Sequence, residues 1–205
     1  MTCSYPDHAL SRAERSEPGS GSISGVRDVR VVAVGDSFVA GVGDPEYRGW
    51  LGRVAAATDR SLVALTVYNL GVRRDTSVDV AARWRAECSA RSAGAENRLL
   101  ISFGVNDTAI EDAVGRRVPT ATSEHNLRTL IAAARVMGLE VLVVGPPPVE
   151  HETQNARIRV LDRRFAAVCQ DAAVGYVAVF DGLDRDPTWR VEVARGDGSH
   201  PGAAG

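Results

Sequence analysis

Short apolar runs alternate with longer amphipathic segments along most of the chain. Five of these runs are rich in β-branched residues and end at glycine or polar residues, which is the pattern of buried strands. They cover residues 29–35, 62–70, 98–103, 140–144 and 176–180. Strands of this kind, separated by helices, predict a three-layer α/β sandwich around a five-stranded parallel sheet.

Apolar residues at helical spacing predict helices between the strands. The predicted segments are residues 47–58, about 75–88, 108–114, 123–137 and 155–172. The first helix is expected to bury Trp50, Leu51 and Val54 on one face, and the second to carry Val78 and Trp84 on or near its buried side.

The composition is that of one ordinary globular domain. The 205 residues are 44% hydrophobic and have a formal net charge of -2, so neither a nucleic-acid nor a membrane partner is indicated. Residues 1–25 are rich in Ser, Gly, Pro and charge and are predicted to be a disordered tail, which leaves residues 26–205 as the domain. No signal peptide or membrane span is visible, and this favours a cytoplasmic location.

Metal and cofactor motifs are missing from the sequence. Cys3, Cys88 and Cys169 are far apart and odd in number, so we expect neither a disulfide framework nor a zinc knuckle. A zincin-like stretch begins at His151, but Asn155 stands where the second histidine is needed. Neither a P-loop nor a dinucleotide-binding fingerprint is present, and we expect no metal or cofactor.

Polar residues in small-residue surroundings follow three of the predicted strands and occur again near the C-terminus. They are Ser37, the loop 71–76, Asn106 with Asp107, and the segment 197–201. In an open α/β sheet, ligands bind beyond the carboxyl ends of the strands. These four segments are therefore predicted to converge on one edge of the sheet.

Each segment also has an ordinary explanation when taken alone. Residues 35–37 are common turn formers. Asn106 with Asp107 could be a turn or a helix cap, and residues 106–108 form a glycosylation sequon. His200, which precedes a proline, could be a simple loop residue.

Three blocks together resemble the GDSL esterases of the SGNH hydrolase superfamily. They read Gly-Asp-Ser at 35–37, Gly-Val-Asn-Asp at 104–107 and Asp-Gly-Ser-His-Pro at 197–201. The resemblance covers about residues 29–205 and implies a flavodoxin-like topology and a serine esterase or lipase-like acyl hydrolase. The family usually continues into a closing helix beyond the position of Gly205, so the resemblance also implies a missing helix and, with it, reduced stability or self-association.

The residue types suit ester cleavage. A serine hydroxyl becomes a good nucleophile when an adjacent base takes its proton, and His200 can serve Ser37 in this way. Asp197 can orient the His200 ring and stabilise its protonated form. The Asn106 amide and the Ser37 backbone N–H can donate hydrogen bonds to the oxyanion that forms when Ser37 attacks a carbonyl.

The remaining oxyanion donor departs from the family pattern. The family's second block usually reads Asn-x-x-x-x-Gly-Asp-Thr, whereas residues 69–76 read Asn-Leu-Gly-Val-Arg-Arg-Asp-Thr. Arg74 occupies the place of the glycine, and Gly71 is the alternative donor. Because the donor is a backbone N–H, we favour Arg74, provided that its backbone angles are ordinary.

The function predicted from the sequence is hydrolysis of small-molecule carboxylic esters. The same residues could instead run acyl transfer to another alcohol or thioester hydrolysis. An alternative of a different class is a non-catalytic, flavodoxin-like module that binds a small molecule in the same crevice.

Overall fold

The predicted five-stranded parallel sheet is confirmed. The computed structural model describes residues 26–92, 94, 96–111 and 115–205, and the predicted N-terminal tail lies outside them. The strands follow the order β2-β1-β3-β6-β7, and every neighbouring pair is parallel. Their bounds are β1 Arg27–Gly35, β2 Val63–Gly71, β3 Glu96–Ser102, β6 Glu140–Val144 and β7 Gly175–Val177.

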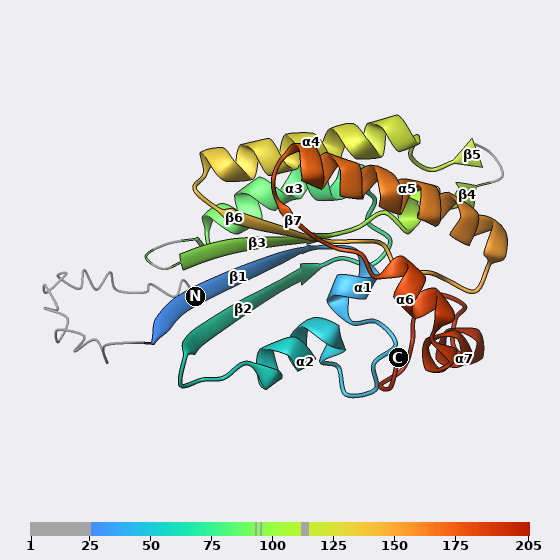
Figure 1. Ribbon diagram of the computed structural model, residues 1–205, viewed down its shortest axis with the longest axis horizontal. Helices are drawn as coiled ribbons and strands as arrows, with labels where there is room; N and C mark the ends of the chain where they lie inside the picture. The colour runs from blue at the N-terminus through green and yellow to red at the C-terminus, as the bar shows by residue number, and fades with distance from the viewer. Residues whose placement is uncertain (1–25, 93, 95, 112–114) are drawn as a thin grey trace, which may run out of the picture.

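Helices cover both faces of the sheet (Figure 1). The chain leaves β1 for the edge strand β2 on one side and then crosses to β3 on the other. Right-handed connections that run in opposite directions place their helices on opposite faces, so α2 lies on one face and α3, α4 and α5 lie on the other. Their bounds are α2 Gly49–Ala57, α3 Ser77–Ser89, α4 Thr120–Val136 and α5 Glu152–Asp171.

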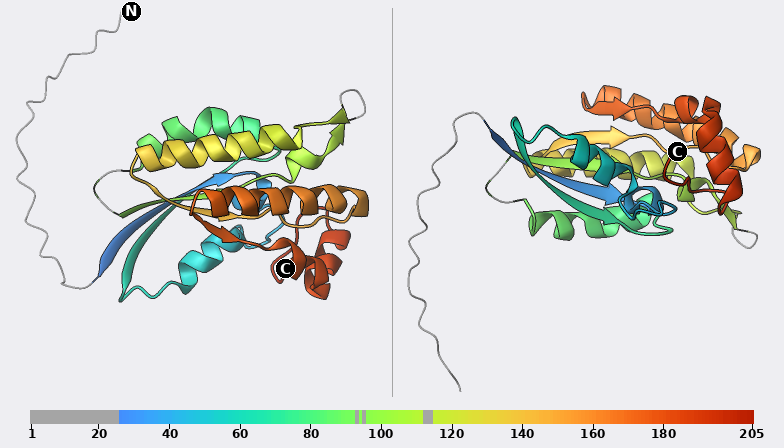
Figure 2. Two further views of the ribbon diagram at one scale, coloured as in Figure 1. Left: turned by 45° about the horizontal axis from the view of Figure 1, so that its top comes forward. Right: turned by 90° about the horizontal axis from the view of Figure 1, so that it is seen from below.

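Three further helices stand at the carboxyl end of the sheet, as Figure 2 also shows. These are α1 Ser37–Ala40, α6 Phe180–Arg185 and α7 Pro187–Arg195. A small antiparallel hairpin, β4 Ile110–Glu111 with β5 Gly115–Arg116, follows the 3₁₀ turn η1 Asn106–Thr108. The chain ends beside α7.

The apolar strand residues are divided between the two faces of the sheet. Val34 and Ile101 belong to the large core beneath α3, α4 and α5, whereas Ala33 and Leu100 pack with Leu51 of α2. Successive side chains of a strand point to opposite faces. Burial on both faces is the reason that these strands read as continuous apolar runs.

The face that carries α2 is covered less completely. A groove of about 440 Å³ runs between α2 and the sheet and is lined by Val31, Leu65, Val67 and Leu142, among others. Val54, which we predicted to be buried, is 59% exposed along this groove. The helical spacing was correct, but Val54 lines this open groove and does not pack closely against the sheet.

Two predicted segments differ from the structure. Residues 108–114 were expected to be helical, but the helical part is the single turn η1, and the hairpin strand β4 follows it. Residues 112–114 lie outside the described residues. The strand predicted at 176–180 ends at Val177, because Phe180 begins α6 and its ring is fully buried there.

Two helices differ from the prediction in detail. Helix α3 buries Ser77, Val80, Trp84 and Cys88, whereas Val78 is 48% exposed. Its start is fixed by a capping box, in which the Thr76 hydroxyl accepts from the Asp79 N–H and the Asp79 carboxylate accepts from the Thr76 N–H. Helix α4 begins at Thr120, three residues before the predicted start.

None of the helices in the described part of the chain is both long enough and apolar enough to cross a membrane.

Candidate active site

The site is built where three strands end level with one another. Gly35 of β1 is paired with Gly71 of β2 and with Ser102 of β3. A Cβ atom on Gly35 would lie 1.9 Å from the Ser102 carbonyl oxygen, and one on Gly71 would lie 2.2 Å from the Ala40 nitrogen. The two glycines therefore allow α1, which begins at Ser37, to rest directly on the end of the sheet.

Ser37, His200 and Asp197 form a continuous hydrogen-bonded chain. The Nε2 atom of His200 lies 2.7 Å from the Ser37 hydroxyl, and its Nδ1 atom lies 2.7 Å from Asp197 Oδ2. A carboxylate can only accept, so Nδ1 carries the proton and Nε2 is free to accept the Ser37 O–H. This tautomer is the one needed for Ser37 to attack an ester.

The loop that carries His200 is held by its own backbone and by neighbouring elements. The backbone N–H groups of Ser199 and His200 both donate to Asp197 Oδ1, at 3.0 and 2.9 Å. The Phe38 ring packs 4.8 Å from the His200 ring, measured between centroids. A Cβ atom on Gly43 would lie 2.4 Å from the Pro201 carbonyl oxygen, so this loop packs against bare backbone.

These contacts keep Asp197 ionised. Partial burial raises the pKa of Asp197, but the N–H groups of His200 and Ser199 and the His200 ring outweigh this effect and lower the pKa to about 2. The carboxylate can therefore hold the His200 ring in orientation over the whole neutral and mildly acidic range.

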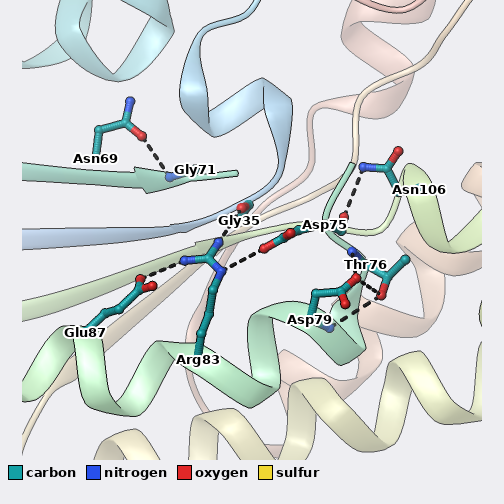
Figure 3. Close-up of polar contacts among 9 residues, drawn as sticks. All are labelled: Gly35, Asn69, Gly71, Asp75, Thr76, Asp79, Arg83, Glu87 and Asn106. Carbon is teal, nitrogen blue, oxygen red and sulfur yellow. Dashed lines mark hydrogen bonds and ion pairs between the residues drawn. The ribbon is translucent and has the colours of Figure 1, made fainter. Parts of the chain in front are cut away.

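Asn106 lies beside the loop that joins β2 to α3. Its amide nitrogen donates to the Asp75 carbonyl oxygen at 3.0 Å (Figure 3). The turn that contains Asn106 is held from α5, because Gln154 donates to the Val105 carbonyl and Arg157 donates to the Thr108 carbonyl. One amide hydrogen of Asn106 is thus engaged, and the second remains for another acceptor.

Arg74 does not have the ordinary backbone angles that we required of it. Its φ is +68°, in the left-handed region that favours glycine. Asp75 N–H donates to the Val72 carbonyl at 3.3 Å, and a turn whose positive φ falls at the third position is of type II. The glycine of the family pattern is thus explained by the backbone, and Arg74 adopts the same conformation at a cost.

Gly71 is less available as the alternative donor. Its N–H donates to the Asn69 side-chain oxygen at 3.0 Å (Figure 3). By contrast, the Arg74 N–H donates to none of the residues within the described ranges.

Replacing Arg74 by glycine is expected to stabilise the protein by about 0.5–1 kcal/mol. Relief of the left-handed strain contributes about 1–2 kcal/mol, and the greater freedom of glycine in the unfolded chain removes about 0.5–1 kcal/mol. The Arg74 side chain is 80% exposed, and its contact with Glu111 is long, at 3.8 Å. The substitution therefore removes only a weak surface ion pair. Catalytic activity should stay within about twofold, since a backbone donor does not depend on the side chain. Urea unfolding and ester kinetics of Arg74→Gly measure both effects.

Arg73 supplies the matched control in the same turn. Its φ is not positive, so Arg73→Gly should lose about 0.5–1 kcal/mol through the greater freedom of the unfolded chain. Equal changes in stability for the two glycine variants would contradict the strain assigned to Arg74.

Two buried carboxyl groups lie next to the candidate nucleophile. Asp36 caps α1 through the Phe38 N–H, and Asp107 accepts from the Ser77 N–H at the start of α3. Each has one carboxyl oxygen without a hydrogen-bond partner in the described part of the chain. Burial, assisted by the nearby Asp107 and Asp75, raises the pKa of Asp36 to about 7, although the hydrogen bond from the Phe38 N–H lowers it. Burial also raises the pKa of Asp107.

Asp36 therefore makes stability depend on pH. Its pKa is raised in the folded state from an ordinary value of 3.8 to about 7, so the folded protein holds this proton more tightly. The protonated Asp36 therefore favours the folded state. Its contribution to the free energy of unfolding is fully present below pH 4 and is lost as the pH rises to about 7. Asp36→Asn should be more stable than wild type by about 4 kcal/mol at pH 8 and by little at pH 4.

Urea unfolding of both proteins between pH 4 and pH 8 measures this difference. The asparagine oxygen can still accept from the Phe38 N–H, so the cap is retained. A stability difference that stays constant with pH would contradict a raised Asp36 pKa.

Aromatic residues line the space beside the loop that carries His200. The Phe38 ring stacks on Trp189 with 6.4 Å between centroids, and the Trp189 indole N–H donates to the Pro148 carbonyl. A pocket of about 210 Å³ adjoins them and is also lined by Trp50 and the last five residues. Trp189 of α7 therefore forms part of the wall of this pocket.

Some residues of the site were not found from the sequence. Asp36, Asp107, Phe38 and Arg83 were not assigned a role, although Asp36 and Asp107 belong to recognised blocks and Phe38 follows one. Their position next to Ser37 or Asn106 was the available signal. In the described part of the chain, no group of three or more His, Cys, Asp or Glu side chains could hold a metal ion.

Comparison with known protein families identifies the family of the chain. The model of the GDSL-like lipase/acylhydrolase family matches residues 33–205. No curated protein matches the chain in sequence.

Solved structures share the fold. A lipase/acylhydrolase from Enterococcus faecalis is 22% identical, with a TM-score of 0.67 over 85% of this chain and 88% of that one. An acetylxylan esterase from Geobacillus stearothermophilus is 18% identical, with a TM-score of 0.69 over 85% and 87%. TesA is 23% identical, with a TM-score of 0.66 over 84% and 88%.

Proposed function

Because the chain belongs to the GDSL-like lipase/acylhydrolase family and is an ester-hydrolysing enzyme, we propose that Ser37, His200 and Asp197 are its catalytic triad. The observation that carries this proposal is the pair of 2.7 Å contacts that join Ser37 Oγ to His200 Nε2 and His200 Nδ1 to Asp197. These residues come from opposite ends of the chain. Their alignment supplies a nucleophile, a base and a group that orients the base.

The proposed reaction has two halves. Ser37 Oγ attacks the ester carbonyl carbon as its proton passes to His200 Nε2, and the imidazolium then gives this proton to the leaving alcohol. Water next attacks the acyl-serine, with His200 taking and returning the proton, and the carboxylic acid leaves. Asp197 stays ionised throughout and stabilises the imidazolium, consistent with its low pKa.

The proposed oxyanion hole consists of the backbone N–H groups of Ser37 and Arg74 and the side-chain amide of Asn106. The N–H of Arg74 has no acceptor within the described ranges, and the Asn106 amide has one hydrogen left after its bond to Asp75. Gly71 is the weaker alternative because its N–H is already bound to Asn69. Donors placed before the charge develops need no reorganisation during the reaction.

A fluorophosphonate probe tests the proposal. The Ser37 oxygen should displace fluoride from phosphorus, so that mass spectrometry locates one adduct on the peptide that contains Ser37 and finds none in Ser37→Ala. Turnover of p-nitrophenyl acetate should disappear with the same substitution. A folded wild-type protein that neither labels nor hydrolyses the ester would refute the assignment and favour the binding module.

A further inference from the structure

A single arginine of α3 ties the candidate oxyanion loop to the strand that carries the nucleophile. Arg83 lies about two turns after the start of α3, and its side chain is only 20% exposed. The guanidinium reaches back beneath the loop 72–76 (Figure 3). Nothing in the proposed triad or hole makes use of it.

The Arg83 guanidinium bonds in three directions. Nε donates to Asp75 Oδ2 at 2.7 Å, Nη2 donates to the Gly35 carbonyl at 3.0 Å, and Nη1 donates to Glu87 at 2.7 Å. The first two contacts join the loop to the end of β1. Glu87 faces away along α3 and steadies the arginine from the side opposite the site.

Gly35 and Asp75, the two residues that Arg83 joins, both lie next to residues of the proposed active site. Gly35 lies two residues before Ser37, and its carbonyl also accepts from the Val72 N–H at 3.0 Å. Asp75 follows Arg74, and its carbonyl oxygen is the acceptor that orients the Asn106 amide. A shift of Asp75 therefore moves two oxyanion donors relative to the nucleophile.

We propose that Arg83 is a positioning residue, which locks the loop carrying Arg74 and Asp75 onto the end of the strand that leads to Ser37. This inference rests on the proposed oxyanion hole. Arg83 acts through Asp75 and Gly35 and touches no reacting atom. Lysine is a poor substitute, because one ammonium group cannot present the planar fork that spans both acceptors.

Kinetics of Arg83→Lys, Arg83→Met and the pair Asp75→Asn with Arg83→Met test the inference. We expect kcat for p-nitrophenyl acetate to fall about 10- to 100-fold with KM nearly unchanged, because small displacements of catalytic groups cost this much. The double variant should be no more than about twofold worse than Arg83→Met, since both changes break the same contact. If Arg83→Met does not fold, the lysine variant and the charge-neutral double variant carry the test.

Arg91 provides the matched control. It is another partly buried arginine, two residues beyond the end of α3, where it donates to the Glu87 carbonyl and lies over the Tyr68 ring of β2. Arg91→Met should therefore loosen the attachment of α3 to the sheet without touching the loop 72–76. We expect it to lower Tm while kcat stays within about twofold.

The Asn106 side-chain amide gives a readout that does not depend on turnover. Its two NMR signals should shift in Arg83→Lys and stay in place in Arg91→Met. Unchanged signals, a kcat of folded Arg83→Lys within twofold of wild type, or equal kcat losses in Arg83→Lys and Arg91→Met would overturn the inference. If wild type lacks ester hydrolysis, the proposed function fails, and the amide signals alone decide whether Arg83 holds the loop.

Discussion

Replacing Ser37 by alanine should lower kcat for p-nitrophenyl acetate by about 10⁴- to 10⁶-fold, the loss expected when the nucleophile of a triad is removed. Ser37 is 6% exposed, so the smaller side chain leaves the packing of α1 nearly intact. Without the hydroxyl, His200 Nε2 loses its 2.7 Å partner and no acyl-serine can form. Initial rates with the purified protein measure the effect.

The two partners of the triad provide an internal check. His200→Ala should cost about as much as Ser37→Ala, and the double variant should cost hardly more than either, because the residues act as one unit. Ser89→Ala is the matched control, since this serine lies on the exposed surface of α3 and its hydroxyl donates to the Arg85 carbonyl. Multiplicative losses in the double variant would show that Ser37 and His200 act independently.

Replacing Asn106 by alanine should lower kcat by about 10²- to 10³-fold while KM changes little, because an oxyanion donor acts mainly in the transition state. The substitution also removes the bond to the Asp75 carbonyl, so a loss of stability of about 1 kcal/mol is expected. Steady-state kinetics at a temperature well below the unfolding transition separate the two effects.

Asn106→Asp sharpens the test of the hole. An aspartate has nearly the same shape but can only accept when ionised, so it should repel both the oxyanion and the Asp75 carbonyl. We expect kcat to fall further than in the alanine variant. An increase of KM at unchanged kcat in either variant would assign Asn106 to substrate binding instead.

The fold was largely predictable because its signals are local. Strands β1 and β3 are buried on both faces near their carboxyl ends, whereas β2, β6 and β7 are only partly covered. All five still read as short apolar runs, which marked the order of strands and helices. The predicted secondary structure was wrong where tertiary contacts determine the local conformation. The single turn at Asn106 is not a longer helix, because its Val105 and Thr108 carbonyls are engaged by α5.

The site was predictable to the level of residue types. Ser37, Asn106 and His200 could be proposed because each stands in a short block whose chemistry is recognisable. Arg83 could not be found in this way, since an arginine on an amphipathic helix ordinarily points into solvent. Only the packing of α3 against β1 brings its guanidinium to Gly35 and Asp75.

The sequence by itself determined the alternation of strands and helices, the glycines at the strand ends and the residue types available for catalysis, because these depend on short-range pattern. The tertiary structure alone decided the distances and backbone angles. It brings His200 to 2.7 Å from Ser37 across 163 residues of chain. It also imposes a φ of +68° on Arg74 and buries Asp36, because both depend on how distant segments pack at the end of the sheet.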